Sequence, residues 1–176
     1  MPPEENSRNL SPVPRWFVVG TLLAALLCSG WALTRGWNNS LRDAHEFRQL
    51  QTALSAYYFK KEGVKLAYET PVLGPPWSIP MEFPLYQAVV AKVSAATRVP
   101  LEQSGRIVSV FFFYATLPAV WLLLRRRLPG PLDPLPALAA LLVCPLYLFY
   151  SRTFMIESTA LCLTTWFVVF LNRALA

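Results

Sequence analysis

The stretch FVVGTLLAALLCSGWAL, residues 17–33, contains no charged side chain and is apolar around the full circumference of a helix. A buried helix of a soluble protein usually keeps a polar stripe on one side. A bilayer core of about 30 Å takes roughly 20 helical residues. The stretch therefore predicts a membrane-spanning helix. A cleaved signal peptide is the alternative, but its apolar part would have only about 7–15 residues, which favours an uncleaved anchor.

The rest of the chain repeats this pattern. Only 15% of the residues are charged and 55% are hydrophobic, whereas an ordinary soluble domain has about 25% charged residues. Further apolar runs lie at residues 107–124, 135–150 and 154–171. The third run of the chain is short for a span and contains Pro136 and Pro145, so it needs flanking residues or a locally thinner bilayer. We predict an all-α integral membrane protein with about four transmembrane helices.

The predicted organisation is a disordered tail followed by one membrane domain. The tail covers residues 1–14 and the membrane domain residues 15–176. The spans are expected at about residues 16–34, 106–125, 134–151 and 154–172, with an outer loop at residues 35–105 between the first two. Helical spacing within the loop predicts two interface-lying helices, LRDAHEFRQLQTALSAYYF with Leu50, Leu54 and Tyr57 on one stripe, and LYQAVVAKVSAATRV. Asn39 or Ser40 is expected to cap the first of them.

Positive charges give the expected orientation. Arg125, Arg126 and Arg127 form a cluster in a short connection, and Arg8 and Arg15 precede the first span. Cytoplasmic loops carry an excess of Lys and Arg, so we expect a cytoplasmic N-terminus and an outer loop on the other side. The +6 net charge is interpreted as interfacial, and no nucleic-acid partner is expected. The three cysteines all lie in apolar runs and are expected to be packing residues without a metal or disulfide role.

Two groups of polar residues are candidates for chemistry. Glu157 and Arg152 border the last apolar run, where a buried charge is costly and usually faces a cavity or a partner. Asp43 and Glu46 lie three residues apart near the membrane surface, and the predicted topology puts all four on one side. Two carboxylates and a cation suit transfer from a lipid-carried phosphate. The alternatives are an Arg152 that snorkels to headgroups and a surface helix that Asp43 and Glu46 merely solvate. His45 is interpreted as a surface residue, with a metal contact as the alternative.

The order of these features resembles a known family. A span is followed by a helix opening with Asp, a Pro-rich segment, a second helix and YSRTFMIES, with MEFPLYQ and SGRIVSVFFF between them. Over residues 26–171 this resembles the N-terminal part of the membrane glycosyltransferases of the C-type fold. The closest branch holds the protein O-mannosyltransferases and the lipid A aminoarabinose transferases. The chain is much shorter than members of that family, so we interpret it as an N-terminal part.

The resemblance implies roles for six residues. Asp43 occupies the place of the catalytic acid, and Arg152 and Glu157 match a signature of an Arg, four residues and an acid. Tyr86 and Glu82 belong to an element similar to the family's Pro-Leu-Tyr element, where Glu82 replaces the usual His or Lys. Glu46 is a candidate substitute for the acid that many members have directly after the catalytic Asp. Asp43 and Glu157 are therefore the catalytic candidates, and Arg152, Glu46, Glu82 and Tyr86 the substrate-binding candidates.

The function that the resemblance implies is transfer of a sugar from a polyprenyl-phosphate donor to a hydroxyl of a lipid, glycan or protein outside the cytoplasm. The expected partners are membrane lipid, the lipid-linked sugar and the acceptor. No cofactor is assigned, and a divalent metal is left open. The expected location is the bacterial inner membrane, with the endoplasmic reticulum as the alternative. The competing functions are a non-enzymatic four-span scaffold or accessory subunit and part of a lipid-sugar flippase.

Overall fold

The computed structural model describes residues 14–42, 44–68 and 82–175. Within these ranges the only regular secondary structure is helix, which confirms the predicted all-α class. The helices are α1 (Arg15–Thr34), α2 (Glu46–Glu62), α3 (Leu85–Thr97), α4 (Leu101–Arg125), α5 (Leu135–Val143), α6 (Pro145–Ser151) and α7 (Glu157–Ala174).

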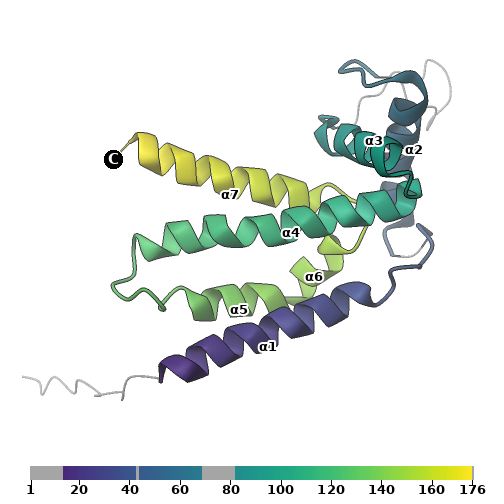
Figure 1. Ribbon diagram of the computed structural model, residues 1–176. Coiled ribbons are helices and arrows are strands. Elements are labelled where there is room, and N and C mark those ends of the chain that lie inside the picture. Colours follow the sequence, from purple (N-terminus) through teal and green to yellow (C-terminus); the bar gives the residue numbers. More distant parts are fainter. Residues whose placement is uncertain (1–13, 43, 69–81, 176) are drawn as a thin grey trace, which may run out of the picture.

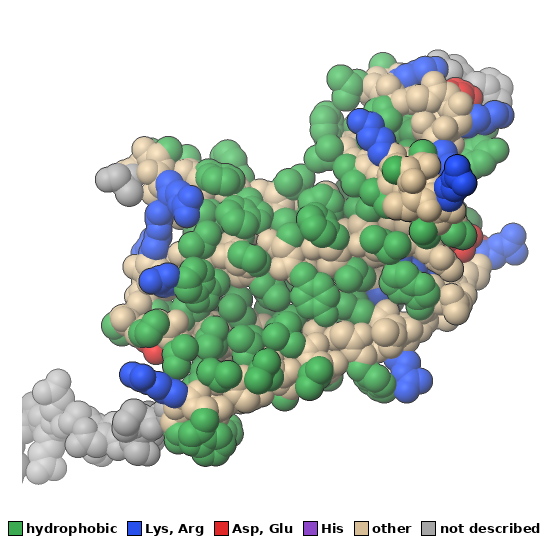
Figure 2. All heavy atoms as spheres, viewed as in Figure 1, with side chains coloured by type: hydrophobic (Ala, Val, Ile, Leu, Met, Phe, Trp, Pro, Cys, Tyr) green, Lys and Arg blue, Asp and Glu red, His purple; other side chains and the backbone are tan. Residues whose placement is uncertain are grey.

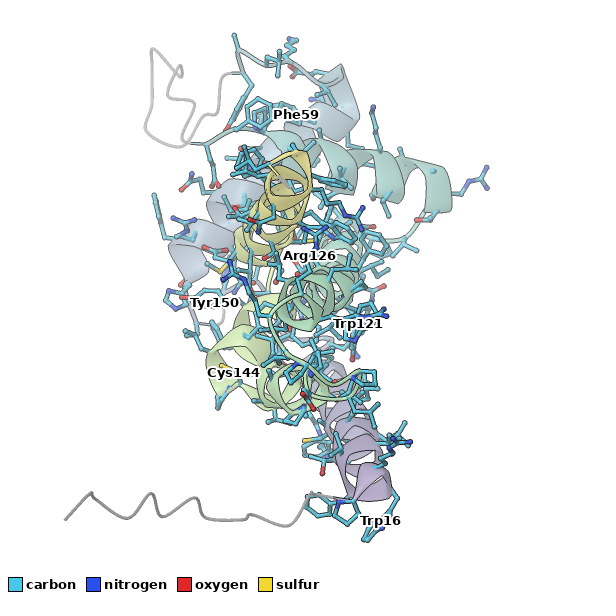
Figure 3. All side chains as sticks on the ribbon, turned by 90° about the vertical axis from the view of Figure 1, so that its left-hand side faces the viewer. Trp16, Phe59, Trp121, Arg126, Cys144 and Tyr150 are labelled. Atoms are coloured by element: carbon cyan, nitrogen blue, oxygen red, sulfur yellow. The ribbon has the colours of Figure 1, made fainter. Side chains whose placement is uncertain are left out.

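The long helices run side by side and the two loop helices lie across one end of them. Figure 1 shows α4 beside α7 and α5 beside α1, and these are the pairs in closest contact. The helices α2 and α3 pack on each other where α4 begins. Figure 3 looks along the bundle from the opposite end and shows α2 and α3 lying crosswise behind it. We call these the α2–α3 end and the triple-arginine end, the latter after residues 125–127.

Two helices, α1 and α4, are long and apolar enough to cross a membrane. Both leave most of their apolar surface exposed, with 17% and 28% of the hydrophobic stretch buried. The core helix of a soluble protein would bury this surface instead. Figure 2 shows the same pattern on one face, where hydrophobic side chains cover the middle of the bundle and Lys and Arg gather at its two ends. This distribution matches an apolar band between two polar layers.

The run predicted as the third span is two helices rather than one. The backbone at Cys144 is extended, with φ −62° and ψ 116°, because the ring of Pro145 disfavours helical geometry in the residue before it. The helices on either side have 9 and 7 residues. The fourth run is helical only from Glu157 onward, over 18 residues, and the preceding residues Phe154 and Met155 are buried in the protein.

The first loop helix begins later than predicted, and the structure shows which of its faces is buried. It begins at Glu46, after His45 in the left-handed conformation, so the expected caps Asn39 and Ser40 are not at its start. The stripe of Leu50 and Tyr57 is exposed. The buried face instead carries Gln49, Thr52, Ala53, Ser55, Ala56 and Phe59. Mostly small side chains face the neighbouring helices because they allow the helix axes to approach closely.

The two larger clusters of buried apolar side chains lie at the α2–α3 end and inside the bundle, and a smaller one joins Phe59, Tyr68 and Ala91. The cluster at the α2–α3 end consists of Leu41, Ala53, Ala56, Tyr86, Val90, Val108 and Phe154. The cluster inside the bundle consists of Ala25, Leu33, Phe113, Ala139, Leu142 and Tyr147. The first cluster joins α2, α3 and α4 to the segment before α7, so it fixes the position of Glu157 relative to the loop helices.

Candidate functional site

The first turn of α7 lies against α2 at the α2–α3 end. Glu157 accepts a hydrogen bond through Oε1 from Nη2 of Arg48 at 3.1 Å, and the two form an ion pair. Its other oxygen, Oε2, is buried without a hydrogen-bond partner, as are the hydroxyls of Ser158 and Thr159. Buried polar atoms are nearly always hydrogen-bonded in proteins. The start of α7 therefore offers three buried oxygen atoms whose hydrogen-bonding capacity is unused.

A second carboxylate belongs to the same cluster. Burial is the largest effect on Glu82 and raises its pKa. The positive charge of Arg48 lowers this pKa, and the negative charge of Glu157 raises it. Oε2 of Glu82 is also buried without a hydrogen-bond partner. The charges of Arg48 and Glu157 thus lie near enough to Glu82 to act on its ionisation.

Arg48 was missed by the sequence analysis, which took Arg152 as the cation that accompanies Asp43 and Glu157. A signal was present in the sequence, because Arg48 lies five residues after Asp43. Nothing in the sequence indicated that Arg48 pairs with a residue 109 positions away in the chain. Only the packing of α2 beside the start of α7 supplies that pairing.

Arg152 lies apart from Glu157 and contacts a different segment. Its Nη1 donates a hydrogen bond to the backbone oxygen of Arg35 at 3.0 Å, and its guanidinium is 6.0 Å from the ring centroid of Phe149. The sequence analysis considered Arg152 near the start of the same span as Glu157. In the structure a non-helical link at residues 152–156 separates them, and Arg152 ties the end of α6 to the residue after α1.

Tyr86 is a fully buried connection between α3 and α4. Its hydroxyl donates to the backbone oxygen of Gly105 at 2.9 Å and lies 3.0 Å from Oγ of Ser109. Its ring meets that of Phe154 edge-on, with centroids 5.8 Å apart. Burial is the largest cause that raises the pKa of Tyr86. The Tyr86 side chain therefore supports the link before α7, and its hydroxyl is already engaged.

Arg106 is a second arginine that sequence analysis did not single out. It is 4% exposed and donates hydrogen bonds to the backbone oxygens of Gly36, Trp37 and Asn39. It thereby fixes the loop after α1 onto the start of α4. A charge at the start of an otherwise apolar helix was the available signal, but in sequence it looked like an ordinary flanking charge.

A small pocket adjoins this loop. Its volume is about 20 Å³, and a single water needs about 10–15 Å³, so it has room for a water but not for a sugar. It is lined by Gly36, Asn39, Ser40, Ala44, Gln49, Arg106, Phe149, Arg152 and Thr153. Gln49 lies at the edge of the pocket and is held at both ends of its amide group. Its Nε2 donates a hydrogen bond to the backbone oxygen of Ala44 at 2.9 Å, and its Oε1 accepts one from the N–H of Phe154 at 3.1 Å.

The remaining candidates are placed as follows. Asp43 lies outside the described residues. Glu46 is exposed in the first turn of α2 and has no ion pair within the described part of the chain. His45 is exposed and its ring is 5.6 Å from that of Phe149. In residues 14–42, 44–68 and 82–175, no group of three His, Cys, Asp or Glu side chains is arranged to hold a metal ion.

These contacts make one polar layer at the α2–α3 end, built from α2, the start of α4 and the start of α7. Comparison with models of protein families, with curated proteins and with solved structures finds no match to this chain.

Proposed function

We propose that the chain is the N-terminal part of a multi-pass membrane glycosyltransferase whose donor is a polyprenyl-phosphate sugar. The observation that carries the proposal is the start of α7, where an ion-paired carboxylate and three buried oxygen atoms without partners stand at one end of an apolar bundle. Polar atoms left unpaired at the rim of an apolar layer suit a polar substrate that a membrane lipid presents there.

In this proposal four segments cross the membrane. They are α1, α4, the pair α5 and α6, and α7, and the N-terminus is cytoplasmic. Cys144, at the break, is half-buried and packs against the cluster inside the bundle, and packing of this kind helps to tolerate non-helical backbone at membrane depth. The loop helices α2 and α3 lie along the opposite membrane surface, in the cell membrane of a bacterium.

The proposed reaction is an inverting transfer. Asp43 accepts the proton of an acceptor hydroxyl, the hydroxyl oxygen bonds to the anomeric carbon, and the bond from that carbon to the phosphate oxygen breaks. Polyprenyl phosphate leaves with the electron pair of that bond. Glu157, which is ion-paired with Arg48, and Glu82 orient the acceptor. Arg152 holds the loop that carries Asp43, which its hydrogen bond to Arg35 supports.

The test measures sugar transfer in membranes that contain the complete enzyme. With a radiolabelled polyprenyl-phosphate sugar, we expect Asp43→Asn to lower turnover by about 10²–10⁴-fold, the usual contribution of a general base. Glu157→Gln should lower it less and raise KM for the acceptor. Glu102→Gln, which changes an exposed carboxylate at the start of α4, is the matched control. Unchanged turnover in Asp43→Asn would refute the assignment.

A non-enzymatic scaffold is the second candidate, and the size of the pocket favours it. The pocket beside Gln49 and Arg152 has a volume of about 20 Å³, which is too small for a sugar. If the scaffold is correct, wild-type membranes show no transfer, and Asp43→Asn rescues a deletion strain as fully as the wild type does.

A further inference from the structure

A groove of about 660 Å³ lies at the triple-arginine end, between the first turns of α1 and the loop that leads to α5. This volume is within the range of about 300–1,000 Å³ typical of small-molecule sites. The groove is lined by Arg15, Phe17, Val18, Thr21, Gly130, Pro131, Leu132, Asp133 and Pro136. It belongs to no part of the candidate site, which is at the opposite end of the bundle (Figure 1).

The lining is apolar along the groove and charged at two residues. Asp133 is engaged in its own turn, because Oδ2 accepts a hydrogen bond from the N–H of Gly130 at 2.8 Å. Arg15 is exposed, and it makes no ion pair or side-chain hydrogen bond with the residues that the structure describes. An apolar groove therefore ends beside a cation that is available for an anion.

The surroundings favour an anionic lipid. Trp16 is 75% exposed, and Figure 3 shows it at the end of α1, pointing away from the bundle. Exposed tryptophans of membrane proteins lie at headgroup level. Arg125, Arg126, Arg127 and Arg173 lie toward the same end of the bundle. Basic residues at a membrane surface concentrate anionic lipids.

We propose that this groove binds an anionic phospholipid, with an acyl chain along Phe17, Val18 and Pro136 and the phosphate on Arg15. An acyl chain fits a groove that is continuous with the exposed apolar surface of α1, and a phosphate complements the unpaired guanidinium. The site would hold one lipid of the surrounding bilayer against the seam between α1 and α5. The inference rests on membrane insertion of α1 and not on glycosyl transfer.

The experiment titrates the 176-residue chain, purified and delipidated in a neutral detergent, with phosphatidylglycerol or phosphatidylcholine of identical acyl chains, and counts bound lipids by native mass spectrometry. We expect phosphatidylglycerol to bind more tightly and Arg15→Gln to weaken it about fivefold, the effect of one basic residue at a membrane surface. Arg173→Gln removes the same charge outside the groove and should weaken binding less than Arg15→Gln does. Thr21→Trp fills the groove and should abolish binding of both lipids.

Three results would overturn the inference. They are equal binding of the two lipids, equal weakening by Arg15→Gln and Arg173→Gln, and binding of glycerol 3-phosphate as tight as that of the whole lipid, which would make the site a free-phosphate site. Circular dichroism of each variant verifies that its helix content is unchanged. Sugar-transfer activity is not the readout, so a failure of the proposed glycosyltransferase leaves this test interpretable.

Discussion

At the residue scale, close packing around Phe154 decides where Glu157 lies. Phe154 is fully buried between Tyr86 and the backbone of α4 at Gly105. A Cβ atom at position 105 would overlap the ring of Phe154. Gly105 is therefore required by the close approach of the ring, although its own backbone is ordinary helix.

We expect Gly105→Ala to lower the free energy of unfolding by about 1–3 kcal/mol, the usual cost of overpacking a core. Thermal unfolding in detergent measures it. Gly20→Ala is the matched control, because nothing lies within 4 Å of its Cβ position, and it should stabilise α1 by about 0.5–1 kcal/mol. Adding Phe154→Leu to Gly105→Ala should recover part of the loss, since the two residues are in contact. Strict additivity would contradict the packing explanation.

The raised pKa of Glu82 gives a pH-dependent stability. A carboxyl whose pKa is higher in the folded protein binds its proton more tightly there, so stability is greatest at low pH. The stability falls as the pH rises from 4.5, the usual pKa of a glutamate, to the higher pKa that Glu82 has in the folded protein. Glu82→Gln removes this cost, and we expect it to raise Tm at pH 7 by no more than about 2–4 °C, with no difference below pH 4.

The control for this prediction is Glu102→Gln, whose carboxylate is exposed. Melting curves of the wild type and both variants between pH 4 and pH 7.5 provide the measurement. A Glu82→Gln variant that is less stable than the wild type at pH 7 would show that the carboxylate is stabilised in the folded protein, against the direction given by its burial.

At the element scale, buried polar side chains fasten the loop after α1 to the start of α4 and to the link before α7. Arg106 binds three backbone oxygens of residues 36–39, and Gln49 bridges Ala44 and Phe154. Backbone oxygens of a loop need donors when they lie away from water. The conformation of the loop is therefore set by side chains that are distant in the sequence.

Arg106→Lys tests this element. A lysine keeps the charge but loses the planar fork that reaches several oxygens together. We expect a loss of about 2 kcal/mol locally, since hydrogen bonds from charged groups contribute about 1.5–3 kcal/mol. Hydrogen exchange of residues 36–42 should become more than tenfold faster. Arg98→Lys changes an exposed arginine at the end of α3 and should leave the exchange rates as they are. Equal rates in both variants would mean that Arg106 does not hold the loop.

At the scale of the whole molecule, the surface has an apolar band between two polar ends, and α2 and α3 lie crosswise at one of these ends (Figures 1 and 2). If the band spans a bilayer, the loop around Asn38 and the connection around Pro129 lie in different compartments, since α4 runs from one end to the other.

Single cysteines measure this division. In a background in which Cys28, Cys144 and Cys162 are serine, a membrane-impermeant reagent added to intact cells should label Asn38→Cys and leave Pro129→Cys unlabelled. Both should react after the membrane is permeabilised. Phe167→Cys, on the exposed apolar face of α7, should react with a lipid-soluble reagent and not with the impermeant one. Labelling of positions 38 and 129 from the same side would exclude a spanning α4.

The sequence by itself determined the helical class and the apolar helices. An uncharged run of 18 residues has few other stable forms, and Pro145 imposed a local break that its neighbours could not remove. The buried face of α2 and the partner of Glu157 were decided by tertiary structure. Helical periodicity identifies an apolar stripe but does not tell whether the protein buries it, since Leu50 and Tyr57 are exposed and Gln49 is buried. The pairing of Arg48 with Glu157 depends on how α2 packs around Phe154, just before α7, and no local sequence signal indicates that packing.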